Sequence, residues 1–198
     1  MEKLKKYKDE FAKIKGIYIF VFVTYILLSR IVPLVNFSSQ DLNSVIYSAL
    51  AIIGAALVAF DFFMSFSMFK SRENIILLVF WVICLISSLL NMKYGIVNNV
   101  KTLVWMAIQF FLFFSFVNTK DEEINKTLKL IMNSSAAIWL AGVIASLVEF
   151  FLQISYIAPA SDFPRRQGFT EARLFGVFTD PNFAALTSVL VIIFCLYL

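Results

Sequence analysis

Long apolar segments separated by short polar ones dominate the chain. Six of them approach the roughly 20 residues that a helix needs to cross the hydrocarbon core of a bilayer. If each segment is a helix, its apolar residues lie on all of its faces instead of forming one stripe, as expected in lipid. The segments cover about residues 16–35, 44–69, 74–91, 97–117, 128–154 and 181–198. The pattern predicts an all-α fold: a polytopic transmembrane bundle of about six helices in a single domain, with a loop at residues 155–180.

Positive charges alternate between the polar segments. Six lysines lie within the first fifteen residues, whereas residues 37–44 carry no lysine or arginine. Cytoplasmic segments of membrane proteins carry an excess of Lys and Arg. The alternation therefore predicts a multi-pass protein of the plasma membrane with a cytoplasmic N-terminus, and it places the loop at 155–180 on the outer face.

The composition supports a membrane protein and narrows the chemistry. Only 15% of the residues are charged and 61% are hydrophobic, whereas soluble domains carry about 25% charged residues. The net charge of +4 comes largely from the N-terminal lysines, which suit anionic membrane lipid, so we expect no nucleic-acid partner. The chain has no histidine, which excludes a histidine base and a histidine-containing zinc site within it. Cys84 and Cys195 lie in apolar runs and indicate small buried hydrophobes, and we expect neither a metal nor a cofactor.

The outer loop carries three arginines, against the usual charge bias: Arg165, Arg166 and Arg173. Arginine is the side chain suited to bidentate contact with phosphate or carboxylate, so the loop is a candidate anion site. The alternative is a self-neutralising loop, since three acidic residues balance the arginines: Asp162, Glu171 and Asp180.

The end of this loop has the pattern of a helix start. Asp180 is a good N-cap, Pro181 fits the first helical position, and Asn182 adds a polar group at the second. The backbone N–H groups of such a start point outward and favour an anion. Gly168 and Gly176 flank the Arg173 segment and allow tight turns or close backbone approach.

Three further charged residues lie within or at the edge of the expected spans. They are Arg30, Asp61 and Glu149. Charges inside a membrane are costly and are candidate functional residues. The alternative is a structural pair, either Arg30 with Glu149 or an arginine with Asp61, or snorkelling of the Arg30 side chain to the membrane surface.

The segment Arg173-Leu-Phe-Gly176-Val-Phe-Thr-Asp180-Pro181-Asn182-Phe-Ala-Ala resembles the O-antigen ligase and polymerase superfamily of bacterial membrane proteins. In that family the segment follows the fifth helix and opens the next, as it does here. The resemblance implies the N-terminal half of a larger, metal-independent membrane glycosyltransferase-like fold. It also implies a polyisoprenyl-diphosphate-linked sugar as the substrate, whose diphosphate Arg173 would bind, with Arg165 and Arg166 carried over as neighbours.

The chain departs from that family in two ways. It ends inside an apolar helix, where the family has further helices, and it lacks the histidine that serves the ligases as a catalytic residue. The resemblance thus assigns residues that bind the substrate diphosphate, but it assigns no general base. We expect a capsular or exopolysaccharide repeat-unit polymerase, or a ligase, working with other polysaccharide-assembly proteins. The alternatives are an inactive fragment of such an enzyme and a non-enzymatic transporter or lipid-binding protein.

Overall fold

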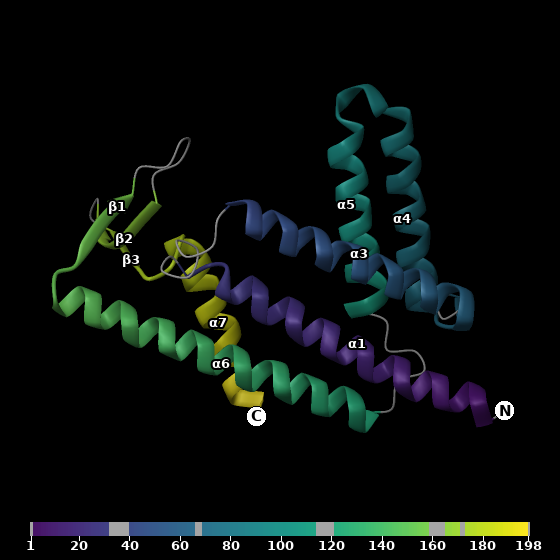
Figure 1. Cartoon of the computed structure of the whole chain (residues 1–198), viewed down its shortest axis with the longest axis horizontal. Helices are drawn as coiled ribbons and strands as arrows, with labels where there is room; N and C mark the ends of the chain where they lie inside the picture. The colour runs from purple at the N-terminus through teal and green to yellow at the C-terminus, as the bar shows by residue number, and fades with distance from the viewer. Residues whose placement is uncertain are drawn as a thin grey trace. The chain divides into compact units, whose positions relative to one another are not determined.

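The computed structural model of the chain describes residues 2–31, 40–65, 69–113, 121–158, 165–170 and 173–197, and this part is mostly helical (Figure 1). Its α-helices are α1 (Glu2–Leu28), α3 (Gln40–Ser65), α4 (Arg72–Leu90), α5 (Ile96–Ile108), α6 (Asp121–Phe151) and α7 (Pro181–Tyr197). A short 3-10 turn, η2 (Met92–Tyr94), precedes α5, and a π-helical turn, η3 (Gln109–Phe113), follows it.

Within the described ranges, five helices are long and apolar enough to cross a membrane. The qualifying segments are Glu10–Leu28, Leu42–Phe63, Arg72–Leu90, Ile96–Phe113 and Glu122–Phe151. The apolar part of α7 is shorter and runs over Pro181–Leu196. The prediction of an all-α polytopic bundle is confirmed.

Several helix ends differ from the expected spans. α1 begins at Glu2, well before residue 16, because the lysine-rich tail continues the helix instead of preceding it. α6 likewise begins at Asp121, seven residues before the expected start at residue 128. Hydropathy marks where a helix becomes apolar, whereas a helix can extend into polar sequence with good intrinsic propensity, such as Lys and Glu.

The chain divides into two compact units, and the first consists of Met1–Ile19 with Ser44–Ile124. Within it, α4 and α5 form a hairpin (Figure 1), in which the Trp81 indole N–H donates to the carbonyl of Leu103 at 2.9 Å. The part of α1 that belongs to this unit contacts α3, and the Tyr18 hydroxyl donates to the Leu50 carbonyl at 2.9 Å. Gly54 permits this contact, because a β-carbon there would lie 2.3 Å from the Tyr18 hydroxyl.

The second unit consists of Phe20–Asn43 with Asn125–Leu198 and has its own core. The Trp139 ring of α6 stacks on Phe178, with 4.2 Å between the ring centroids. The Trp139 indole N–H also donates to Ser188 of α7 at 2.9 Å. Together with Val177, these rings form a buried cluster that holds α7 and the segment before it on α6.

A three-stranded antiparallel sheet follows α6, in the order β1 (Ser155–Ala158), β2 (Arg165–Thr170) and β3 (Arg173–Gly176) (Figure 1). The register pairs Ile157 with Arg166 and Thr170 with Arg173, with an irregularity after Gly168. The segment expected as a loop between two spans, residues 155–180, thus contains short strands between α6 and α7. Strand pairing satisfies the backbone N–H and C=O groups, which an irregular segment beside an apolar surface would leave without partners.

Candidate functional site

A cavity lies between the sheet and the N-terminus of α7, within the second unit. It has a volume of about 300 Å³. Its lining comes from β2, β3 and the start of α7, namely Arg166, Arg173, Phe175, Thr179, Asp180, Pro181 and Asn182. The structure thus brings two of the three candidate arginines together with all three residues predicted at the helix start.

The two arginines reach the cavity from neighbouring strands. The guanidinium carbon of Arg166 lies 5.9 Å from the ring centroid of Phe175, which is within the range of a cation–π contact. The Arg173 side chain is exposed, and within the described residues no hydrogen bond or ion pair engages its guanidinium. Arg165 begins β2, but its side chain lies outside the described part of the chain. Two positive groups from adjacent strands therefore line one cavity.

The predicted start of α7 is confirmed. An Asp180 carboxylate oxygen (Oδ1) accepts the backbone N–H of Asn182 at 2.8 Å. The Asp180 carbonyl accepts the N–H of Ala184 at 3.0 Å, and Pro181 is the first helical residue. The capped helix contributes the positive end of its dipole to the side of the cavity that Asn182 lines.

Ser146 of α6 holds the end of β3. Its hydroxyl accepts the N–H of Val177 at 3.0 Å and donates to the carbonyl of Gly142 at 2.8 Å. Gly176 lies so close that a β-carbon there would be 2.1 Å from the Ser146 hydroxyl, and its φ of +58° also favours glycine. The predicted need for close approach at Gly176 is confirmed, and the contact fixes the strand that carries Arg173.

Glu149, one turn further along α6, holds the middle of the sheet. The side-chain amide of Gln167 donates to its Oε1 atom. Glu149 is only 8% exposed, and its other carboxylate oxygen has no hydrogen-bond partner among the described residues. Gln167 neighbours Arg166, and successive side chains of a strand point to opposite faces. Glu149 therefore supports the sheet and does not line the cavity.

Arg30 lies beside the start of α7 but does not line the cavity. Its carbonyl accepts the N–H of Thr179 at 2.9 Å, and its guanidinium carbon lies 5.0 Å from the ring centroid of Phe183. Within the described residues no ion pair joins Arg30 to Glu149. The hypothesis of an Arg30–Glu149 pair is therefore wrong: the carboxylate has an amide partner, and the guanidinium has an aromatic one.

The third candidate charge, Asp61 of α3, lies in the first unit. It is 8% exposed and interacts electrostatically with Lys15 of α1, which is 5% exposed. The structure gives Asp61 a lysine partner from the N-terminal cluster, whereas the sequence suggested an arginine. These two opposite charges are buried together between two apolar helices.

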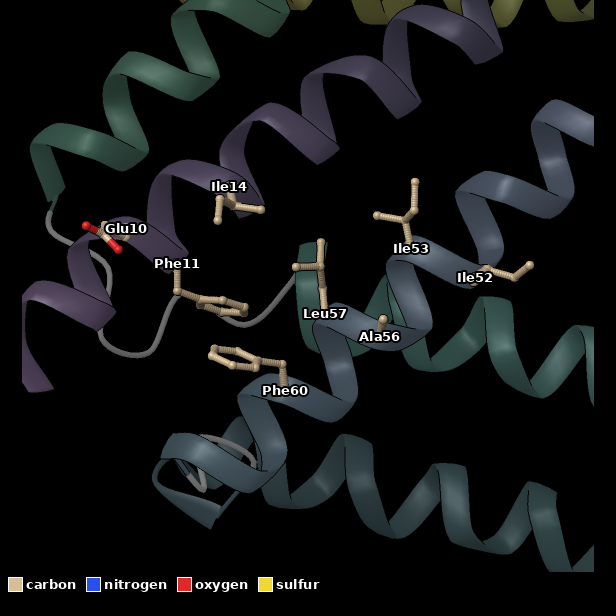
Figure 2. Close-up of a pocket in the computed structure, with 8 residues that line it drawn as sticks. All are labelled: Glu10, Phe11, Ile14, Ile52, Ile53, Ala56, Leu57 and Phe60. Atoms are coloured by element: carbon tan, nitrogen blue, oxygen red, sulfur yellow. The ribbon is translucent and has the colours of Figure 1, made fainter.

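The first unit contains a different cavity, a groove between α1 and α3 (Figure 2). It has a volume of about 460 Å³, and all its lining residues except Glu10 are apolar. Phe11 and Phe60 stack at one end, with 5.5 Å between their ring centroids. Without a cationic side chain in its lining, this groove does not suit a phosphate group.

The sequence did not reveal the roles of three residues: Lys15 beside Asp61, Gln167 beside Glu149, and Ser146 at the end of β3. Lys15 falls in a basic tail, where charge patterning indicates a membrane surface and not a buried partner. Ser146 carries a usable signal: a small polar residue four positions after Gly142 marks a helix face that another segment can approach closely. Gln167 has no such signal, because its role depends on strand register.

Comparison with known proteins identifies no family model, no curated protein and no solved structure that matches this chain.

Proposed function

We propose that the protein is a polysaccharide repeat-unit polymerase, or a ligase, that acts on polyisoprenyl-diphosphate-linked oligosaccharides at the outer face of the plasma membrane. One observation carries the proposal, namely the cavity that Arg166 and Arg173 share with the N-terminus of α7. Two guanidinium groups, each able to make bidentate contact with phosphate, and the positive end of a helix dipole favour an anion there, beside the one carboxylate of the described lining, that of Asp180.

The reaction needs charge stabilisation on the leaving group. When an acceptor hydroxyl attacks the anomeric carbon of the lipid-linked sugar, negative charge develops on the departing diphosphate. Arg173 is the better placed arginine, because no described residue already engages its guanidinium. Preorganised positive charge at that point lowers the barrier, and loss of one such group typically costs about 10²–10³ in rate.

The first test removes the cation. In the full-length protein, Arg173→Ala should lower polymer formation at least about 10²-fold. Arg173→Lys should retain part of the activity, because lysine keeps the positive charge but cannot bind phosphate in a bidentate way. Arg72→Ala is the matched control, since Arg72 is an exposed arginine at the start of α4. Polymer of normal length and yield from the Arg173→Ala variant would remove this arginine from the mechanism.

The second test is the side of the membrane. With Cys84 and Cys195 replaced by serine, a cysteine at the exposed position Tyr156 of β1 should react with an impermeant thiol reagent in intact cells or spheroplasts. A cysteine at Lys13 of α1, expected in the cytoplasm, should react only after the membrane is broken. The reverse pattern would make the cavity arginines ordinary cytoplasmic residues.

The buried Lys15–Asp61 pair favours a second candidate, a transporter whose path uses charges within the membrane. The two functions separate by mutation. Loss of function in Asp61→Asn, together with normal function in Arg166→Ala and Arg173→Ala, would favour transport. The opposite result supports the polymerase.

A further inference from the structure

The described lining of the cavity has one ionisable side chain able to accept a proton. Among the described residues that line it, Asp180 is the only carboxylate, and the other ionisable side chains are the two arginines. Arginine stays protonated in proteins, and the chain has no histidine. A transfer reaction to a sugar hydroxyl needs a group that takes the hydroxyl proton, and the cavity offers this one.

The geometry leaves half of that carboxylate open. One oxygen accepts the N–H of Asn182 at 2.8 Å, which orients the group at the end of α7. The Asp180 side chain is exposed, and within the described residues no ion pair ties it to Arg166 or Arg173. The carboxylate is therefore held by one oxygen, while the other can accept a hydrogen bond from a ligand in the cavity.

We propose that Asp180 is the general base for the acceptor hydroxyl, an inference that rests on the proposed function. In the step, the acceptor oxygen forms a bond to the anomeric carbon of the donor sugar and its proton passes to the open oxygen of Asp180. The bond from that carbon to the diphosphate oxygen breaks, and the electron pair leaves with the diphosphate. Arg166 and Arg173 bind the charge released there, so acid–base work and leaving-group binding fall to different residues of one cavity.

The alternative role of Asp180 is capping alone, and one substitution separates the two. Asparagine caps a helix about as well as aspartate, because its amide oxygen can also accept the Asn182 N–H, but it is not a base. Asp180→Asn should leave the folded protein intact and lower kcat by about 10²–10⁴-fold. Its KM for the lipid-linked donor should stay within about twofold of the unsubstituted protein, since the step lost is proton transfer and not donor binding.

The assay is initial-rate polymer formation in membrane vesicles, with a polyisoprenyl-diphosphate-linked repeat unit as both donor and acceptor. Asp180→Ser, a second good cap without basicity, should show the same loss of kcat. Near-normal kcat in both variants would reduce Asp180 to a cap and overturn the proposal.

The same experiment keeps this inference apart from the proposed function. An active unsubstituted protein with an equally active Asp180→Asn variant refutes the general base and leaves the polymerase standing. If the unsubstituted protein forms no polymer while the substrate is intact, both proposals fall. Donor binding gives a further check: Asp180→Asn should bind the lipid diphosphate normally, whereas Arg173→Ala should bind it more weakly.

Discussion

Charged side chains meet apolar helices in both units, and their surroundings differ. In the first unit, Lys15 and Asp61 are both more than nine-tenths buried, and each has the other as an electrostatic partner. In the second unit, Arg166 and Arg173 have the same sign, and both line a cavity. The first set is a pair of opposite charges, whereas the second is two like charges that line a cavity.

Under the proposed function, this difference separates structural charge from functional charge. A buried pair of opposite sign has its partner within the fold, and such pairs serve best to specify which helices meet and in which register. Two cations on adjacent strands repel each other, and an anionic ligand in the cavity that they line with Asp180 would offset that repulsion. Lys15 and Asp61 therefore pair α1 with α3, whereas under the proposed function the arginines form part of a binding site.

The largest expected effect on stability comes from removing one member of the buried Lys15–Asp61 pair. Lys15→Met should leave a buried carboxylate without its partner and lower the free energy of unfolding by about 3–5 kcal/mol. The measurement is denaturant unfolding of the purified protein in mixed micelles.

The double variant Lys15→Met/Asp61→Leu is the control, because apolar residues of similar size can replace a buried pair at little cost. It should recover most of the lost stability. A double variant as unstable as the single one would show that these residues contribute more than mutual neutralisation, and the contrast between the two units would weaken.

The next effect concerns the contact that holds β3 on α6. Gly176→Ala should destabilise the protein by about 2–4 kcal/mol, since it combines a strained φ with a clash against Ser146. Gly95→Ala is the matched control: Gly95 has a φ of +118°, but no other atom lies within 4 Å of the position that a β-carbon would take there. It should cost about 1–3 kcal/mol from backbone strain alone. Equal losses in thermal unfolding would mean that close approach to Ser146 is unimportant.

A smaller effect is expected from the serine itself. Ser146→Ala removes the acceptor of the buried Val177 N–H and should cost about 1–3 kcal/mol. Ser134→Ala on the same helix should change little, because that hydroxyl donates only to carbonyls of its own helix. If the position of Arg173 depends on the bond between Ser146 and Val177, Ser146→Ala should also lower polymer yield, and Ser134→Ala should not. Thermal unfolding and polymer assays on the same membranes check both results.

The sequence predicts the helices well because a bilayer imposes one simple requirement on a spanning segment. Some 20 apolar residues must satisfy their own backbone hydrogen bonds, and a helix does so. The small sheet is not subject to this requirement. Strands β1 to β3 are short, and they are set by pairings such as Gly168 with Ser155 and Gly176, which hydropathy does not encode.

The candidate site was predictable to the extent that it depends on local sequence. Asp180, Pro181 and Asn182 form a cap whose contacts span two to four residues, and the structure has it as expected. The partners of Asp61 and Glu149 were not predictable. Lys15 lies 46 positions from Asp61 and Gln167 lies 18 from Glu149, so only the packing of helices and the strand register bring them together.

The smallest expected effect concerns Arg30, another cation of the second unit. Arg30 has an aromatic partner in Phe183 at 5.0 Å and lies outside the cavity lining. An exposed cation–π contact contributes about 0.5–1 kcal/mol, so Arg30→Ala should lower stability by that amount and leave polymer formation unchanged. Thermal unfolding together with the vesicle assay measures both. A loss of polymer as large as that of Arg173→Ala, without a larger loss of stability, would mean that a cation already engaged by the fold also serves the ligand. The proposed distinction between charges that stabilise the fold and charges that bind the ligand would then be wrong for Arg30.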